Sequence, residues 1–240
     1  MVQSPKPMIQ EDVITAVDHV IRERKTAKVL RDRHDCAPLP EDLQTNLHTT
    51  LQALIELAGW APFHKLADKQ LHRQGTMQSI VPWRFHVLEK PACCQLVNEL
   101  QVQAEQFPDS IWSRAWDSKI PQLLAGSSAL ILATWLPDPS SVEGMPELTI
   151  NNMEHIAAAS AAVQNLLLAS EARGLHTYWG SGGILRSKEI FEYLQISTHE
   201  ILLGAIFITS PEVDARETQP GSLRNQRGTP ADWSRWVELE

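Results

Sequence analysis

The sequence predicts a single α+β domain, in which amphipathic helices flank a sheet of short apolar strands. The 240-residue chain is 43% hydrophobic and 21% charged, a composition typical of a globular protein with a substantial core. Helical and strand periodicities both recur along the chain, and no repeat, low-complexity tract or clean linker divides it. We therefore treat residues 1–240 as one domain.

Three long segments place apolar residues at helical spacing. Residues 11–24 begin with two acidic side chains, which the positive end of a helix dipole favours. Residues 41–60 carry one apolar stripe that stops at Gly59. The longest segment, residues 149–173, is rich in alanine and is followed by Gly174. At about 1.5 Å per residue, this last helix is long enough to cross a whole domain.

Strands are expected where short apolar runs or period-two alternation occur. Residues 83–88 alternate large apolar with polar side chains, whereas residues 129–136 and 201–209 are almost continuously apolar. A short strand is expected at residues 176–179. Shorter helices are expected after Pro91, within residues 111–124, and over residues 187–194, where Ser187 is a suitable cap.

Two segments lack regular periodicity. Residues 65–80 are polar and separate two segments that otherwise look closely connected, so we interpret them as an inserted loop or lid. Residues 211–240 mix Pro, Gly, Arg and Trp, and we interpret them as a C-terminal arm laid over another surface.

Composition also limits the partners and the compartment. The net charge of −8 disfavours nonspecific binding of nucleic acid through a basic surface. The longest apolar run is far shorter than the about 18–20 residues of a membrane span, and the first residues lack the apolar core of a secretory signal. The three cysteines, Cys36, Cys93 and Cys94, are an odd count, and adjacent cysteines are poor partners for each other. We therefore expect a cytoplasmic protein with no nucleic-acid or membrane partner.

The chain lacks the motifs of several common kinds of site. The chain has no G-x-G-x-x-G after an N-terminal strand and no P-loop, and its scattered histidines lack the spacing of a metal site. The glycine cluster from Gly180 to Gly183 follows a predicted strand, where exposed backbone N–H groups could meet a ligand, although an ordinary turn is the alternative. Ser181 does not fit a nucleophile elbow, because Trp179 stands where that motif requires glycine.

The segment from Arg24 to Lys28 is the first with a distinctly functional pattern. It places three cations and a hydroxyl within five residues, Arg-Lys-Thr-Ala-Lys. Such a group can bind a phosphate and stabilise an electron-rich ring. The alternative is a solvated basic helix end, which also interacts well with the helix dipole.

Four separated segments, in the same order, resemble the motifs of one family. Residues 24–28 resemble its R-[RH]-S-x-[RK], residues 58–65 its A-x-x-A-P-x-x-x, and residues 82–85 its Q-P-W-x-F. The long helix at residues 152–174 resembles A-x-Q-N-L-x-L-A-A-x-x-x-G-L, and a glycine loop and a strand follow as in the family. Over roughly residues 11–230 the chain thus resembles the nitroreductases, which are FMN-dependent NAD(P)H oxidoreductases.

This resemblance implies a central, mostly antiparallel sheet flanked by helices, in an intertwined homodimer with a flavin at each interface. It also implies a ping-pong reaction in which NAD(P)H, as co-substrate, reduces FMN at N5 and is replaced by an electron-poor acceptor, a nitroaromatic or a quinone. No catalytic side chain is expected, because the cofactor carries the chemistry and the protein supplies position and field.

Site residues follow from the same resemblance, position by position. Arg24, Lys25 and Thr26 would hold the phosphate and ribityl chain of FMN, and Arg224 or Arg227 would complete the phosphate site. Lys28 would lie near the N1/O2 edge of the ring, where a fixed ammonium stabilises the reduced flavin. The loop at the N5 atom would comprise Gly182, Gly183 and Ile184, and His64 would touch the flavin from the Ala-Pro loop.

Departures from the family pattern keep two other functions open. Val81 stands where the family usually has glutamine, and the segment at residues 65–80 is longer than usual. One alternative is therefore a protein of the same fold that binds flavin or another ligand without turnover. The other is a dedicated reductive enzyme with a specific metabolite as substrate.

Overall fold

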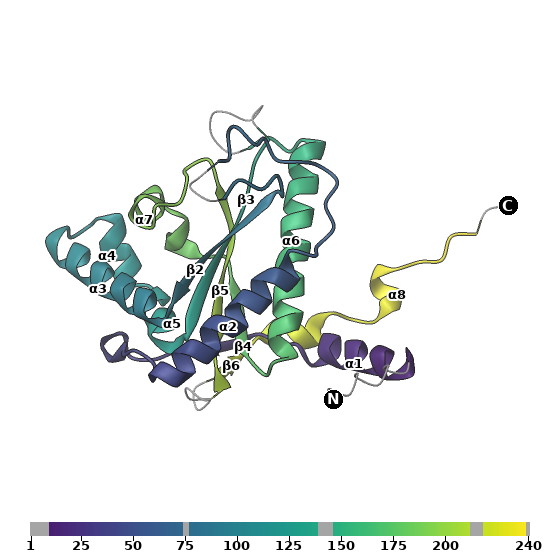
Figure 1. Ribbon diagram of the computed structural model, residues 1–240, viewed down its shortest axis with the longest axis horizontal. Helices are drawn as coiled ribbons and strands as arrows, with labels where there is room; N and C mark the ends of the chain where they lie inside the picture. The colour runs from purple at the N-terminus through teal and green to yellow at the C-terminus, as the bar shows by residue number, and fades with distance from the viewer. Residues whose placement is uncertain (1–9, 74–76, 139–145, 212–217, 239–240) are drawn as a thin grey trace, which may run out of the picture.

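A four-stranded antiparallel sheet forms the centre of the computed structural model, which describes residues 10–73, 77–138, 146–211 and 218–238 (Figure 1). The strand order is β2-β3-β5-β4, and every neighbouring pair is antiparallel. The predicted antiparallel sheet flanked by helices is therefore confirmed. The strands are β2 (Trp83–Glu89), β3 (Ala129–Trp135), β4 (His176–Gly180) and β5 (Ile201–Thr209).

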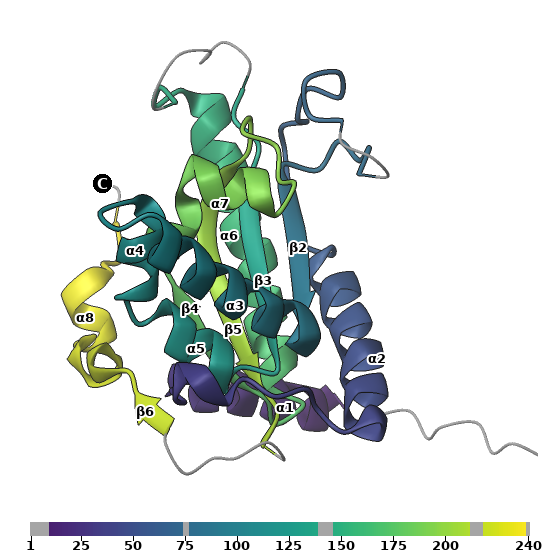
Figure 2. The same ribbon diagram turned by 90° about the vertical axis from the view of Figure 1, so that its left-hand side faces the viewer.

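Helices cover both faces of this sheet. Figure 2 shows α3, α4, α5 and α7 in front of the sheet and α6 behind it, on the same face as α2. Strand β3 explains why two layers are needed: Ala129 and Ile131 pack in the core on one face, whereas Leu130 and Leu132 pack in the core on the other. The helices are α2 (Glu41–Ala58), α3 (Lys90–Gln106), α4 (Ile111–Trp116), α5 (Ile120–Gly126), α6 (Ile150–Glu171) and α7 (Lys188–Tyr193).

Local sequence signals account for most of the helix boundaries. The predicted cap at Ser187 is confirmed, because its side chain accepts a hydrogen bond from the backbone N–H of Ile190. Thr149 caps α6 in the same way, from the N–H of Asn152. The expected helical stretch at residues 111–124 is instead two helices, separated by a turn in which Ser118 Oγ accepts from the N–H of Ile120. None of the helices in the described part of the chain is long and apolar enough to cross a membrane.

A second, two-stranded sheet joins the two ends of the chain and was not predicted. Strand β1 (Ala27–Val29) pairs antiparallel with β6 (Thr218–Pro220), so the C-terminal segment returns to the residues that follow α1 (Gln10–Glu23). The remaining short elements are η1 (Arg33–Asp35), η2 (Gly183–Arg186), η4 (Ser222–Gln226) and α8 (Pro230–Trp233). Helices α1 and α8 extend away from the sheet, on the side of α6 opposite to α3 and α4 (Figure 1).

The segment at residues 65–80 has no helix or strand in its described part, which excludes residues 74–76. Arg84, buried on β2, fixes this segment by donating to the carbonyl oxygens of His72 at 3.4 Å, Ser79 at 2.7 Å and Val81 at 3.0 Å. A charged donor shared by several carbonyls holds the chain more firmly than neutral hydrogen bonds would. The role of the segment as a lid stays a prediction.

The cysteines pair differently from what their spacing suggested. Cys36 and Cys94 form a disulfide across 58 residues of sequence, a pairing that was not predicted. Cys93 is free and buried, and burial raises its pKa to about 12. Its position at the start of α3 therefore serves packing and does not activate the thiol.

Reduction of the Cys36–Cys94 disulfide should lower the free energy of unfolding by about 2–4 kcal/mol, because the cross-link restricts the unfolded chain. Urea unfolding with and without dithiothreitol measures this difference. A double variant, Cys36→Ser with Cys94→Ser, is the control and should not respond to the reductant. Titration of three free thiols in the denatured, unreduced protein would contradict the pairing.

Stability should also fall in mild acid through His72, whose Nε2 lies 2.8 Å from the carbonyl oxygen of Pro137. Burial lowers the pKa of His72 below its ordinary value of 6.5, so the unfolded chain gains a proton that the folded chain lacks as the pH falls. The free energy of unfolding that depends on a neutral His72 is therefore complete above pH 6.5. It decreases below pH 6.5, by up to about 1.4 kcal/mol per pH unit. His72→Asn should flatten the pH dependence of urea unfolding between pH 7 and 5, and an unchanged slope would contradict the assignment.

Candidate functional site

Two adjoining cavities form one elongated cleft beside β1. One cavity, of about 360 Å³, is lined mainly by cationic and polar groups, whereas the other, of about 220 Å³, is lined mainly by apolar groups and glycines. Lys28 and Tyr178 line both cavities and so mark the junction between them. The cleft therefore has a cationic end and an apolar end.

The cationic end gathers side chains from both ends of the chain. Arg24, Lys25 and Thr26 lead into β1, and the tail that follows β6 adds Arg224 and Arg227. The pairing of β1 with β6 is what brings these distant groups together. No carboxylate lies among the described residues that line this cavity, although the chain as a whole carries a net charge of −8.

Arg24 is the group in this cavity that most needs a partner. Its Nε is buried and makes no hydrogen bond within the described structure. Burial is the main cause that lowers its pKa; Glu171 opposes this effect, whereas Arg227 and Arg224 add to it. An anion bound here would both accept from the guanidinium and compensate for its lost hydration.

Arg224 serves mainly to attach the tail to α1. Its guanidinium donates to the carbonyl oxygens of Glu23 and Arg24, each at 3.0 Å, and of Arg22, which are the last carbonyls of α1 and its junction with β1. Both tail arginines, one of which the resemblance assigned to a phosphate site, line the cavity. Because Arg224 donates to backbone carbonyls, Arg227 is the tail cation better placed to meet a ligand.

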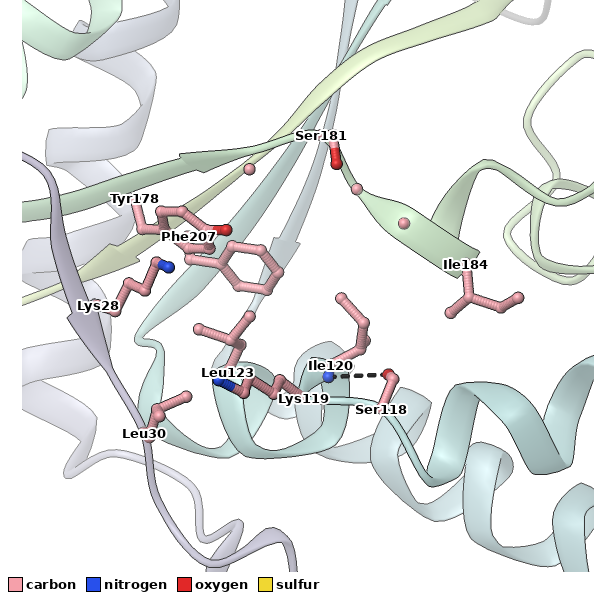
Figure 3. A pocket seen from close by; sticks show the side chains of 13 residues that line it. Lys28, Leu30, Ser118, Lys119, Ile120, Leu123, Tyr178, Ser181, Ile184 and Phe207 are labelled. Carbon is pink, nitrogen blue, oxygen red and sulfur yellow. Dashed lines mark hydrogen bonds between the residues drawn. The ribbon is translucent and has the colours of Figure 1, made fainter. Parts of the chain in front are cut away.

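Aromatic and aliphatic side chains form the apolar end (Figure 3). Tyr178 stacks on Phe207 with ring centroids 5.8 Å apart and planes inclined by 16°. The Nζ of Lys28 lies 4.6 Å from the centroid of the Tyr178 ring. Figure 3 shows these three side chains on one side of the cavity, facing Leu123 and Ile120 of α5. A flat apolar ring could lie between these walls, with an ammonium at its edge.

The wall formed by α5 depends on two contacts at the end of this helix. A Cβ atom at Gly126 would lie 2.4 Å from the carbonyl oxygen of Val29, so only glycine lets β1 approach this closely. Lys90 is almost completely buried and donates to the carbonyl oxygens of Ala125 at 2.6 Å and Ser127 at 3.0 Å. Burial lowers the pKa of Lys90 to about 8, yet its two hydrogen bonds satisfy one carbonyl in the last turn of α5 and the carbonyl of its C-cap residue, Ser127.

A glycine turn closes the far side of the apolar cavity. Gly182 and Gly183 have φ angles of +86° and +51°, and a Cβ atom at Gly182 would lie 2.3 Å from Leu202 Cδ2. The turn therefore requires glycine for both its conformation and its packing. Within the described residues, the backbone N–H groups of Gly182 and Gly183 donate to no other group. These donors are available to a ligand in the cavity, beside the side chain of Ile184.

Most of the residues predicted from the sequence thus meet at one cleft, but His64 does not. It is exposed on the segment that follows α2, and α2 covers the sheet face opposite to α5. The residues that line the cleft are Arg24, Lys25, Thr26, Lys28, Gly182, Gly183, Ile184, Arg224 and Arg227.

Tyr178 and Phe207 line the cleft but were not predicted as site residues. Their strands were predicted, but which strand residues face the cleft depends on the order and pairing of β4 and β5.

The described residues hold no cluster of three metal-ligating side chains. The arrangement is suited to hold a ligand that has an anionic end and a flat apolar end.

Comparisons with known proteins identify the fold. No family model and no curated protein matches the sequence. Among solved structures, a nitroreductase-like family protein from Bacillus cereus has a TM-score of 0.62 and 19% identity, covering 98% of this chain and 100% of that chain. The FMN-dependent nitroreductase NfnB from Mycobacterium smegmatis, solved in complex with NADPH, has a TM-score of 0.57 and 15% identity, covering 95% and 100%.

A nitroreductase with bound FMN from Desulfitobacterium hafniense has a TM-score of 0.51 and 19% identity, covering 93% of this chain and 98% of that chain. These identities are low, so the comparisons bear on the fold and not on the activity. The agreement extends over nearly the full length of each pair of chains. The chain has the fold of the nitroreductase family.

Proposed function

We propose that this protein is an FMN-dependent NAD(P)H oxidoreductase that reduces a nitroaromatic or quinone acceptor by a ping-pong mechanism. The observation that supports this proposal best is the division of the cleft into a cationic and an apolar end that meet at Lys28. FMN has the same division, with a phosphate at one end of its ribityl chain and a flat tricyclic ring at the other. When bound, the flavin supplies the hydride chemistry between NAD(P)H and the acceptor.

The cationic end fits a phosphate monoester. Arg24 offers a buried Nε without a partner in the described structure, and Lys25 and Arg227 add positive charge from two separate segments of the chain. Thr26, the residue before β1, lines the same cavity and offers a hydroxyl to the ribityl chain. Guanidinium groups suit a phosphate because their planar donors match its oxygen atoms.

The apolar end fits the ring. Leu123 and Phe207 exclude water from its faces, and Lys28 places an ammonium at its edge, where it favours negative charge on the ring. The N–H groups of Gly182 and Gly183 offer hydrogen bonds to ring nitrogens on the opposite side. The protein thus contributes orientation and electrostatic stabilisation, and the proposal requires no side-chain nucleophile.

We also propose a homodimer, in which His64 of one chain approaches the cleft of the other. Helix α1 contains no buried residue, and its Ile14, Val17 and Ile21 are each more than half exposed. Trp236 in the arm is 98% exposed. Apolar surface of this extent is unusual on a monomer and favours association with a second copy. Helices α1 and α8 lie on the same side of α6, so one partner could cover both (Figure 1).

The cytoplasm is the proposed location. The proposal follows from the odd cysteine count, and the Cys36–Cys94 disulfide argues against it, because disulfides are rare in the cytosol. Cell fractionation with alkylation of free thiols tests the location, and recovery of the protein outside the cytosolic fraction would contradict it.

The visible absorption spectrum of the purified protein, with mass identification of any released chromophore, tests the proposed function. Stoichiometric FMN that NADH or NADPH reduces under anaerobic conditions, followed by turnover with menadione, is the expected result. Bound FMN that neither nucleotide reduces would favour a binding protein of the same fold. A colourless protein that cannot be loaded with FMN would exclude a flavoenzyme.

Arg24→Ala should weaken FMN binding by about 10- to 100-fold, because a hydrogen bond to a charged group contributes about 1.5–3 kcal/mol. Arg22→Ala is the matched control, since Arg22 is exposed and pairs with Asp18 at 2.7 Å on the surface of α1. Fluorescence titration of the apoprotein with FMN measures both dissociation constants. Equal constants for the two variants would remove Arg24 from the phosphate site.

Replacing Ile14 and Val17 with aspartate should convert a dimer at micromolar concentration into a monomer, because two charges would then face an apolar interface. Thr15→Asp, also exposed on α1, adds a charge beside that face and serves as the control. Sedimentation velocity reports the association state. A wild-type protein that sediments as a monomer would contradict the proposed homodimer.

A further inference from the structure

The glycine turn at the apolar end of the cleft is braced from outside by a guanidinium. Arg186, the last residue of η2, donates from a terminal nitrogen to the carbonyl oxygen of Ser181. Arg186 is exposed and lines neither cavity, whereas Ser181, Gly182 and Gly183 all line the apolar one. We propose that Arg186 is a positioning residue, which orients the Ser181–Gly182 peptide so that its N–H faces the ring-binding cavity. This inference rests on the proposed function of the cleft.

Peptide geometry links the two sides of the turn. In a planar trans peptide the carbonyl and the N–H point in opposite directions. The oxygen of Ser181 accepts from Arg186, which lines neither cavity, so the opposed N–H of Gly182 is left to face the cavity that Gly182 lines. Gly182 is buried, and its N–H has no acceptor within the described structure. A buried N–H without an acceptor is unfavourable, and a ligand atom in the cavity would satisfy it.

The turn needs this brace because glycine alone does not fix a peptide orientation. Leu202 limits any movement of Gly182, but nothing lies within 4 Å of the position that a Cβ atom would take at Gly183. On the far side, within the described turn, the carbonyl of Gly182 accepts a backbone hydrogen bond from the N–H of Leu185, at 2.9 Å. A charge-assisted hydrogen bond at Ser181 fixes the preceding peptide more firmly than a neutral one.

The orientation of this peptide has an electrostatic consequence for the ligand. With Ser181 held outward, the cavity faces an N–H donor, which favours electron density on a ring nitrogen. A rotated peptide would instead present the Ser181 oxygen, which repels that density. Arg186 therefore acts through Ser181 and Gly182 on both the affinity for the flavin and its reduction potential, although it touches neither cavity.

The test compares Arg186→Met with Lys188→Gln. Lys188 is exposed, lies two residues further along and pairs with Glu192 at 3.3 Å, so its replacement removes the same charge without touching the turn. For each protein we would measure the FMN dissociation constant and the midpoint potential of the bound flavin. Arg186→Met should raise the dissociation constant about fivefold and make the potential more negative, because one hydrogen bond is lost. Arg186→Lys should restore both values in part, and Lys188→Gln should change neither.

Each outcome decides between the inference and the function on which it rests. If Arg186→Met matches Lys188→Gln in affinity and potential, the inference is wrong and the flavin function stands. If Arg186→Met changes affinity but not potential, Arg186 has only a structural role and the inference is also wrong. Failure of the wild-type protein to bind FMN would overturn both. Hydrogen exchange of residues 182–187 in the apoprotein gives a flavin-independent check, and unchanged exchange in Arg186→Met would contradict a brace.

Discussion

The cleft depends on how closely the backbone of β1 is held between its neighbours. This three-residue strand lies against Gly126 of α5 on one side, pairs with β6 on another and is joined to β4 by a bridge between Thr26 and Thr177. Three elements that are distant in sequence therefore determine where Arg24 and Lys28 lie. A side chain at position 126 would push β1 away and separate the two ends of the cleft.

The cavity beside β1 is cationic, although the chain as a whole carries a net negative charge. The net charge is −8, yet the described lining of the cationic cavity contains no carboxylate, and the partly buried Arg24 has a lowered pKa. Gathering cations in this way costs folding free energy, because their charges repel one another and one of them loses hydration. Natural chains retain such local conflicts mainly at functional sites, where a bound anion compensates for the cost.

The sequence predicted those features that local chemistry determines. The strand at residues 201–209 and the cap at Ser187 follow from apolar runs and from the hydroxyl of a helix cap, and both match the structure. The pairing of β1 with β6, the Cys36–Cys94 disulfide and the bonds of Arg224 to the end of α1 join segments that have no common pattern. No periodicity reports such contacts, because only the tertiary fold brings the partners together.

The site residues show the same difference between features that a local sequence pattern indicates and features that only tertiary contacts create. The group from Arg24 to Lys28 was recognisable because its three cations lie within five residues, whereas Tyr178 and Phe207 became site residues only through the pairing of β4 with β5. The resemblance placed His64 at the flavin, but within this chain His64 lines neither cavity of the cleft.

Lys28 lies where the cationic and apolar ends of the cleft meet. Its contact with Tyr178 explains how one ammonium can serve both ends. Its Nζ lies 4.6 Å from the centroid of the Tyr178 ring, and this cation–π contact holds the charge at the junction of the two cavities. At a partly exposed site such a contact contributes only about 0.5–1 kcal/mol. The ammonium of Lys28 is therefore preorganised at the junction but held only weakly by the Tyr178 ring. It can turn toward negative charge on a ligand at little cost in free energy.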